Sequence, residues 1–292
     1  MTIHQILLKT VKKLKKNNIK NPHLEAELLL SAILKKPREY ILSHPDYKLN
    51  CLQIINYKLK ITRRIGGSPL AYLTRSKGFY GRNFYVNKNV LIPRPETEMM
   101  IDEALKLKEE KIFIDIGTGS GCIIISLIKE LQKRNVFINN YKFYASDVSK
   151  NALIIAKKNA KIYKVDNLIK FYQSNLLDSI INKFKNINSQ IIICANLPYL
   201  TLEQIKNSPS IQKEPKLALK AGSDGLKYYR KLLPQVAKLK MKNEKLRIII
   251  YLEIDDIQKN SIQKLIKEVL PSSKYKIKTD LRNKSRLVII KL

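Results

Sequence analysis

The segment Ile112-Phe-Ile-Asp-Ile-Gly-Thr-Gly-Ser-Gly121 is a short apolar run that ends in three closely spaced glycines. The next residues, 122–131, are mostly apolar and are typical of a buried helix. A strand, a glycine loop and a helix in this order let the backbone pass close to a bound nucleotide, at the positive end of the helix. The spacing Gly-x-Gly-x-Gly differs from the dinucleotide-binding pattern, so it requires no pyrophosphate. Taken alone, the loop is equally consistent with a plain tight turn.

An acidic residue follows the next predicted strand. Residues 141–146 are mainly apolar or aromatic, and Asp147 comes directly after them. A carboxylate at the carboxyl end of the second strand of such a fold can hold the two hydroxyl groups of a ribose. The glycine loop and Asp147 together therefore indicate a nucleoside-like ligand.

Strand and helix patterns alternate from residue 111 to the end of the chain. The strands are expected near 112–115, 142–146, 169–173, 191–195, 246–252, 275–279 and 286–291. This alternation predicts an α/β domain with a mainly parallel sheet covered by helices on both faces. Ligands of such sheets gather at the carboxyl ends of the strands.

The fourth of these strands leads into the turn Asn196-Leu197-Pro198-Tyr199. An amide or aromatic amine nitrogen is a poor nucleophile, because its lone pair is delocalised into the neighbouring carbonyl or ring. The side-chain carbonyl of Asn196 and the main-chain carbonyl of Leu197 can accept both hydrogens of an NH2 group and turn its lone pair toward an electrophile. Pro198 stiffens the turn and Tyr199 offers a flat wall. In isolation, an ordinary Asn-Pro turn is about as good an interpretation.

Composition excludes several other classes of protein. The chain has 292 residues, 45% of them hydrophobic, which is enough for two domains. Its apolar stretches are too short to span a membrane and its first residues lack a signal-peptide pattern, so we expect a cytoplasmic protein without membrane contact. Cys51, Cys122 and Cys194 are far apart and are expected in the core, and the three histidines all lie in the first fifty residues. These positions predict no metal site and no catalytic histidine.

The formal net charge of +32 invites a nucleic-acid interpretation. However, 45 lysines stand against 11 arginines, and the lysines are spread along the whole chain. Arginine and aromatic residues are not interleaved as in a stacking platform. A compositionally biased, solvated surface is therefore favoured about two to one, and an acidic protein partner stays open.

The part of the chain before residue 93 has a different pattern. Residues 1–74 carry apolar positions at helical spacing, including Leu52, Ile55 and Leu59 in the last helix, and predict a small helical bundle. Residues 78–92 alternate aromatic and β-branched residues and predict a hairpin. The predicted domains are thus 1–74, a hairpin linker at 75–92, and an α/β domain at 93–292.

Six motifs in order resemble the protein-(glutamine-N(5)) methyltransferases that modify peptide chain release factors, the PrmC/HemK family. The matching segments are Gly67–Leu73, Leu91–Glu98, Asp115–Gly121, Asp147–Ser149, Asn196–Tyr199, and Glu214–Leu219 with Asp224–Leu226 and Tyr229-Arg230. The resemblance covers almost the full length. It implies a helical domain that binds release factors and a class I S-adenosylmethionine-dependent methyltransferase fold, with a Rossmann-like seven-stranded sheet whose last strand is antiparallel.

The resemblance also implies an activity and its site. S-adenosyl-L-methionine would be the cofactor, and the substrate would be the glutamine of the Gly-Gly-Gln motif in class I release factors, with no nucleic acid required and a monomeric enzyme expected. The residues implied to contact the cofactor are Gly117, Thr118, Gly119, Ser120, Gly121, Asp147, Asn175 and Asn196. The catalytic turn would be Asn196, Leu197, Pro198 and Tyr199, which with Phe79 would also shape the slot for the substrate.

The chain departs from the family pattern at three places, and two other functions stay open. Leu197 replaces a proline of the usual Asn-Pro-Pro-Tyr turn, 174–176 replace an Asp followed by an aromatic residue, and 252–258 lack a usual glycine. One alternative is an adenine-N(6) methyltransferase acting on ribosomal RNA or DNA, because the turn also resembles that of ribosomal RNA adenine dimethyltransferases. The other is a catalytically degenerate module that binds release factors or the ribosome.

Overall fold

The computed structural model describes residues 1–107, 111–184 and 189–292. The chain divides into two compact units. One contains Met1–Ser76 together with Pro209–Lys213, and the other contains Lys77–Ser208 and Glu214–Leu292. Each unit has its own hydrophobic core, as the contact clusters show.

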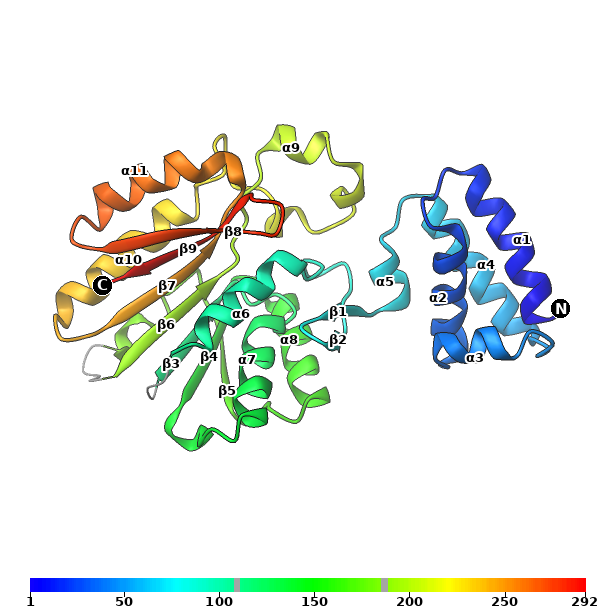
Figure 1. Cartoon of the computed structure of the whole chain (residues 1–292), viewed down its shortest axis with the longest axis horizontal. Coiled ribbons are helices and arrows are strands. Elements are labelled where there is room, and N and C mark those ends of the chain that lie inside the picture. The colour runs from blue at the N-terminus through cyan, green and yellow to red at the C-terminus, as the bar shows by residue number, and fades with distance from the viewer. Residues whose placement is uncertain (108–110, 185–188) are drawn as a thin grey trace. The chain divides into compact units, whose positions relative to one another are not determined.

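The first unit is built of short helices (Figure 1). They are α1 Ile3–Lys16, α2 Pro22–Leu34, α3 Arg38–Ser43, α4 Cys51–Ile65 and α5 Leu70–Thr74. α1 and α4 both begin with a capping box, in which Thr2 and Asn50 accept from the backbone of the third helical residue. The buried Tyr57 of α4 donates a hydrogen bond to the carbonyl of Ala26 at 3.0 Å, which ties α4 to α2. This agrees with the helical bundle expected from the apolar spacing.

The apolar stripe that predicted α4 lies on its exposed face. Leu52, Ile55 and Leu59 are 72%, 60% and 47% exposed, whereas Tyr57 and Ile61 of the same helix are buried in the core. Both stripes have helical spacing, so the pattern identifies the helix but does not tell which face packs inward.

A two-stranded hairpin begins the second unit. Strands β1 Lys77–Phe79 and β2 Arg82–Phe84 pair antiparallel. Tyr80 and Gly81 form the turn, with φ of +48° and +68°. Two successive positive φ values match the twist of a tight hairpin. Tyr80 is held there by Glu98, whose Oε1 accepts from the Tyr80 amide at 2.7 Å. The hairpin is shorter than the 78–92 segment in which it was expected.

The second unit is centred on a seven-stranded sheet within the described residues. Its strands are β3 Lys111–Ile116, β4 Lys142–Asp147, β5 Ile169–Gln173, β6 Gln190–Ala195, β7 Ile248–Glu253, β8 Lys274–Thr279 and β9 Ser285–Lys291. Their order is β5-β4-β3-β6-β7-β9-β8. β9 runs antiparallel to both of its neighbours, β7 and β8, and the pairs β3–β4, β3–β6, β4–β5 and β6–β7 are parallel. All seven expected strands and the antiparallel last strand are confirmed.

Helices cover both faces of this sheet (Figure 1). The helices that pack on it are α6 Glu98–Ala104, α7 Cys122–Lys133, α8 Lys150–Ile162, α10 Tyr229–Lys242 and α11 Lys259–Val269. The short α9 Leu202–Lys206, which has no buried residue, follows the turn after β6. Successive residues of β3 point to opposite faces: Ile112 and Ile114 pack with α10 and α11, while Phe113 packs with α6 and α7. Both cores are apolar, which explains why the central strands read as unbroken hydrophobic runs.

The cysteines and the apolar character of the helices bear on the expectations from composition. Cys122 and Cys194 are buried as expected, but Cys51 is exposed as the first residue of α4. None of the helices in the described ranges combines the length and the apolar character that crossing a bilayer demands.

Candidate active site at the carboxyl ends of the central strands

Strand register brings the predicted site residues to one level of the sheet. Ile116 of β3 is aligned with Ser146 of β4 and with Ala195 of β6. The next residues along the three strands are Gly117, Asp147 and Asn196. Because parallel strands end at the same edge, residues that are more than seventy positions apart meet there.

A cavity of about 250 Å³ opens at this edge. The residues that were expected to hold cofactor or substrate and that line it are Gly117, Thr118, Gly119, Ser120, Asp147, Asn175, Asn196, Leu197 and Pro198. All of these lie in the second unit. The structure therefore brings the glycine loop, the acid of β4 and the turn after β6 into one cavity.

The glycine loop needs glycine for two physical reasons. Gly117 and Gly119 have φ of +70° and +54°, a region that L side chains rarely adopt. A Cβ on Gly117 would also stand 3.1 Å from Cδ2 of Leu197, so a side chain there would press against the turn after β6. The backbone of the loop is thus bare on the side of the cavity.

Asp147 is tied to the glycine loop and to the start of α8. Its Oδ2 accepts from the Gly119 amide at 3.0 Å and its Oδ1 from the Ser149 amide at 2.8 Å. Burial raises the pKa of the carboxyl group, and these amides oppose that rise. Each carboxylate oxygen has a second lone pair, so the group can accept further hydrogen bonds from a ligand.

Asn159 of α8 fixes the loop from behind. The side chain is fully buried, and its Nδ2 donates to the carbonyl of Ser120 at 2.8 Å and to that of Tyr85 at 3.0 Å. Its Oδ1 accepts from the Tyr85 amide at 2.8 Å. One amide side chain thereby joins the glycine loop to the segment after the hairpin.

Asn196 has one satisfied and one unsatisfied polar atom. Its Nδ2 donates to Oγ1 of Thr97 at 2.9 Å. Its Oδ1 is buried and has no hydrogen-bond partner in the described part of the chain. A buried acceptor without a partner is uncommon in folded proteins and costs free energy, so at a cavity wall it points to a donor on a ligand.

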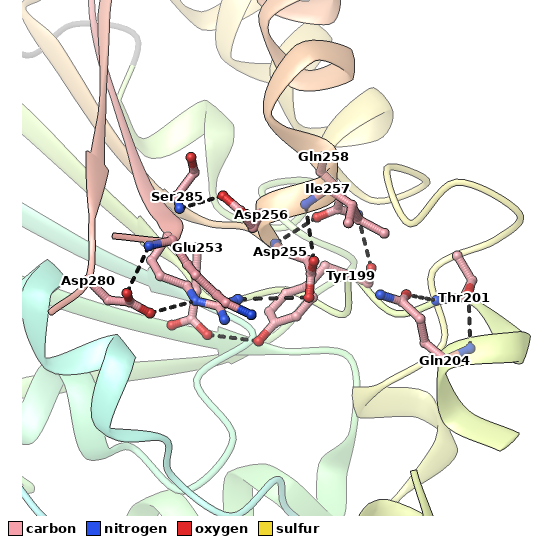
Figure 2. Close-up of polar contacts among 12 residues, drawn as sticks. Tyr199, Thr201, Gln204, Glu253, Asp255, Asp256, Ile257, Gln258, Asp280 and Ser285 are labelled. Atoms are coloured by element: carbon pink, nitrogen blue, oxygen red, sulfur yellow. Dashed lines mark hydrogen bonds and ion pairs between the residues drawn. The ribbon is translucent and has the colours of Figure 1, made fainter. Parts of the chain in front are cut away.

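Tyr199 does not form the flat wall expected of it. It is not among the residues that line the cavity. Its hydroxyl donates to Oε1 of the buried Glu253 at 3.1 Å, and its carbonyl accepts from Nε2 of Gln258 at 2.9 Å (Figure 2). The ring packs against the core on the α10 side, because the turn directs it away from the cavity toward β7. Burial raises the pKa of its hydroxyl well above the ordinary value.

Two other predicted residues also lie outside the cavity lining. Phe79 is 2% exposed and meets Phe84 edge to face inside the core, so it cannot shape a slot for a substrate at this cavity. Gly121 immediately precedes α7 with φ of +79°, and a Cβ there would stand 3.0 Å from Ile125 and 3.3 Å from Ala156. Its role is the close packing of α7 against α8.

Several lining residues were not singled out from the sequence. They are Lys88, Asn89, Val90, Leu91, Pro93, Thr97, Pro215, Leu217, Ala218 and Tyr228, with further residues of the strand ends. Glu214 joins two of these segments, accepting from the Ile92 amide at 3.0 Å and from Arg94 Nη2 at 2.5 Å. Most of them belong to the motif segments 91–98 and 214–219, which could have indicated them.

A buried acid behind the glycine loop predicts a pH effect on stability. Burial raises the pKa of Asp115 to about 7 from an ordinary 3.8, although Thr118 Oγ1 donates to it at 2.6 Å. Between these values the folded protein holds a proton that the unfolded chain releases, so this group lowers the free energy of unfolding as pH rises from about 4 to about 7. We expect this group to cost the wild type a few kcal/mol of unfolding free energy over that pH range, and we expect Asp115→Asn to lack this loss.

Urea unfolding of both proteins at pH 5 and pH 8 measures this effect. The wild type is expected to lose more stability between the two pH values than Asp115→Asn, and the difference between them cancels the contribution of other titrating groups. Equal losses in both proteins would show that Asp115 is ionised throughout.

Two family models match the chain. The model described as the PrmC N-terminal domain matches residues 5–74. The model described as an RMKL-like methyltransferase domain matches residues 96–213. The first match falls on the helical unit and the second includes the glycine loop, Asp147 and the turn after β6.

Curated relatives resemble the chain over nearly all of its length. A release factor glutamine methyltransferase of Mycoplasma mycoides is 31% identical, over 99% of each chain. One of Bacillus anthracis is 30% identical, over 91% of each chain. A bifunctional methyltransferase of Rickettsia felis is 31% identical over 99% of this chain, which spans 58% of that protein. The chain thus spans little more than half the length of this Rickettsia relative.

Two solved structures resemble the chain in fold. The hMettl16 catalytic domain in complex with MAT2A 3'UTR hairpin 6 has a TM-score of 0.53 and 19% identity, covering 82% of this chain and 81% of that chain. The complex with hairpin 1 gives the same TM-score at 14% identity, with 89% and 90% coverage. Together with the sheet order and the methyltransferase model, these likenesses confirm the class I methyltransferase fold.

Proposed function

The chain belongs to the release factor glutamine methyltransferase family, and from that premise we propose that it methylates the side-chain amide of the glutamine in the Gly-Gly-Gln motif of class I release factors. S-adenosyl-L-methionine is the proposed methyl donor. The observation that carries the proposal is that Asn196 lines the cavity and that its buried Oδ1 has no hydrogen-bond partner among the described residues.

The cavity fits a nucleoside-type cofactor. Gly117 and Gly119 present backbone without side chains, and the four lone pairs of the Asp147 carboxylate exceed the three backbone amides that bond to it, so a ribose hydroxyl can donate there. Asn175, after β5, lines the same cavity and is the proposed contact near the adenine ring. Bound there, S-adenosylmethionine would supply an electrophilic methyl group on a positively charged sulfur.

The turn after β6 can compensate for the low nucleophilicity of the glutamine amide that receives the methyl group. A glutamine amide nitrogen shares its lone pair with the adjacent carbonyl, so it attacks poorly in free solution. Asn196 Oδ1 and the carbonyl of Leu197 are proposed to accept its two hydrogens and hold the lone pair toward the methyl group. Orientation of this kind can supply roughly 7–11 kcal/mol of a reaction barrier. No general base is needed beforehand, because the nitrogen releases a proton once it has become cationic.

The test of the proposed function uses a purified class I release factor and S-adenosylmethionine. Mass spectrometry of the peptide that contains Gly-Gly-Gln is expected to show one added methyl group on the glutamine after incubation with the wild type, and none with Asn196→Ala. An unmodified glutamine with the wild type would reject the proposal. Methyl transfer to naked ribosomal RNA in a parallel reaction would favour the adenine enzyme instead.

Cofactor binding provides a separate prediction at Asp147. Asp147→Ala removes the acceptor for the ribose hydroxyls and releases the Gly119 amide, so the dissociation constant for S-adenosylmethionine is expected to rise about 10- to 100-fold. Isothermal titration calorimetry measures it. Asp166→Ala, at an exposed position after α8, is the control and is expected to bind as the wild type does. An unchanged affinity in Asp147→Ala would refute the ribose contact.

A further inference from the structure

Hydrogen bonds connect Asn196 through Thr97, which also lines the cavity, to Glu253, which does not. Asn196 Nδ2 donates to Thr97 Oγ1 at 2.9 Å, and the Thr97 hydroxyl donates to Oε2 of Glu253 at 2.5 Å. The other oxygen of Glu253 accepts from the Tyr199 hydroxyl at 3.1 Å (Figure 2). Thr97 and Glu253 are 2% and 3% exposed, so these bonds are shielded from water.

The sheet explains why these residues meet. Ala195 of β6 is aligned with Leu252 of β7, so the next residues, Asn196 and Glu253, stand at the same level of neighbouring strands. Thr97 reaches between them from the start of α6. The backbone of Glu253 is fixed as well, because its carbonyl accepts a hydrogen bond from the buried Tyr229 of α10. Hydrogen bonds therefore hold both the backbone carbonyl and the side-chain carboxylate of Glu253.

The hydrogen bonds between Asn196, Thr97 and Glu253 can have only one donor-to-acceptor order when Glu253 is ionised. An ionised carboxylate only accepts hydrogen bonds, so the single hydrogen of the Thr97 hydroxyl must go to Glu253. Thr97 Oγ1 is then left with lone pairs alone, and its neighbour on the other side must be a donor. Only Nδ2 of Asn196 satisfies this, since a flipped amide would set two acceptors against each other. The amide oxygen of Asn196 is therefore the atom left over for a ligand.

We propose that Glu253, acting through the hydroxyl of Thr97, is a positioning residue that fixes the Asn196 amide with its oxygen available to the substrate. This inference rests on the proposed function. A flipped Asn196 would present hydrogens to the hydrogens of the glutamine amide and could not hold it. Glu253 is not among the residues that line the cavity, so it acts on the substrate through Thr97 and the orientation of the Asn196 amide.

The same logic gives the effect of protonation. Burial raises the pKa of Glu253, while the hydrogen bonds from Thr97 and Tyr199 lower it. Glu96 adds to the rise and Arg286, which also pairs with Asp280, opposes it. A protonated Glu253 can donate to Thr97, which frees the Thr97 hydrogen to donate to Asn196 Oδ1. The Asn196 amide is then no longer fixed in one orientation. Turnover should therefore fall as pH decreases through this raised pKa.

Three variants test the inference. Thr97→Val keeps the shape and removes the hydroxyl, Thr97→Ser keeps the hydroxyl, and Glu253→Gln replaces a pure acceptor by a group that also donates. Thr97→Val and Glu253→Gln are expected to lower kcat about 10- to 100-fold, with the affinity for S-adenosylmethionine within about twofold of the wild type. Thr97→Ser is expected to restore most of the turnover, and Glu253→Gln should lose the decline of kcat at low pH.

A second readout is independent of methyl transfer. The side-chain amide of Asn196 is assigned in a nitrogen-15 NMR spectrum as the pair of signals absent from Asn196→Ala. Slow exchange of one of its hydrogens is expected in the wild type and in Thr97→Ser, and fast exchange in Thr97→Val. Circular dichroism verifies folding, and if Thr97→Val is unfolded, Glu253→Gln decides by the same two readouts.

The outcomes separate the two proposals. If the wild type fails to methylate a release factor, the proposed function is wrong, and the NMR exchange still tests whether Thr97 and Glu253 hold the amide. If the wild type is active and folded Thr97→Val has wild-type kcat with slow exchange at Asn196, the positioning role is overturned.

Discussion

Asn196→Ala is expected to lower kcat by about 10² to 10³ while leaving the fold intact and weakening the binding of S-adenosylmethionine far less than it lowers turnover. The substitution removes the buried oxygen that is proposed to accept from the glutamine amide. A contact that matters most when the nitrogen is aligned with the methyl group affects turnover more than binding. Steady-state kinetics with a purified release factor, together with calorimetry for the cofactor, measures both quantities.

The matched control for this variant is Asn167→Ala. Asn167 is exposed in the loop after α8, outside the cavity, so its loss should leave kcat unchanged. Turnover in Asn196→Ala within about threefold of the wild type would remove Asn196 from the mechanism, since the loss of one aligned hydrogen bond should exceed that.

Gly225→Ala is expected to destabilise the fold by about 3 kcal/mol or more and to reduce turnover with it. Gly225 has φ of +75°, and a Cβ there would stand 2.1 Å from Gln258 Nε2 and 2.2 Å from the carbonyl oxygen of Tyr199. Gln258 donates to that same carbonyl, so there is no space without moving the backbone of the turn that carries Asn196. Chemical denaturation gives the free energy of unfolding, and kinetics gives the effect on turnover.

Gly222→Ala is the control that separates backbone strain from steric overlap of the added Cβ. Gly222 has a similar φ of +88°, but the nearest atom to its Cβ would be 3.5 Å away, in ordinary contact. Its cost should be about 1–2 kcal/mol, from the backbone conformation alone. If Gly225→Ala costs no more than Gly222→Ala, the close approach of Tyr199 is not rigid and the turn is less constrained than described.

The sheet and the place of the cavity could be predicted from the sequence because both follow from local patterns. The central strands are apolar on both faces and stand out as continuous runs, and the carboxyl ends of parallel strands necessarily share an edge. Glycines followed by a buried helix, and an acid after the next strand, therefore predict that Gly117 and Asp147 lie close together, and both line the cavity.

The orientation of individual side chains, and their contacts with residues far away in the sequence, could not be predicted from local patterns. The turn after β6 was identified, but nothing local says that the ring of Tyr199 points toward Glu253 and away from the cavity. Phe79 is aromatic and near the domain boundary, yet its burial depends on Phe84 across the hairpin. In α4, two apolar stripes compete and only packing decides which one is buried.

The supporting contacts of Asn196 are of the same kind. Thr97 and Glu253 lie 99 and 57 positions from Asn196, and each belongs to a segment whose local pattern reads as an ordinary helix start or strand end. Alignment of β6 with β7 is what makes them neighbours. Register in a sheet is set by the whole core, so residues that act together across it are found only once the strands are placed.

The most direct test of the central claim is a crystal structure with S-adenosylhomocysteine and a Gly-Gly-Gln peptide. The account predicts the glutamine amide nitrogen at about 3 Å from both Asn196 Oδ1 and the carbonyl oxygen of Leu197. A glutamine amide bound elsewhere in the cavity, with Asn196 Oδ1 still unpartnered or facing a water molecule, would contradict it.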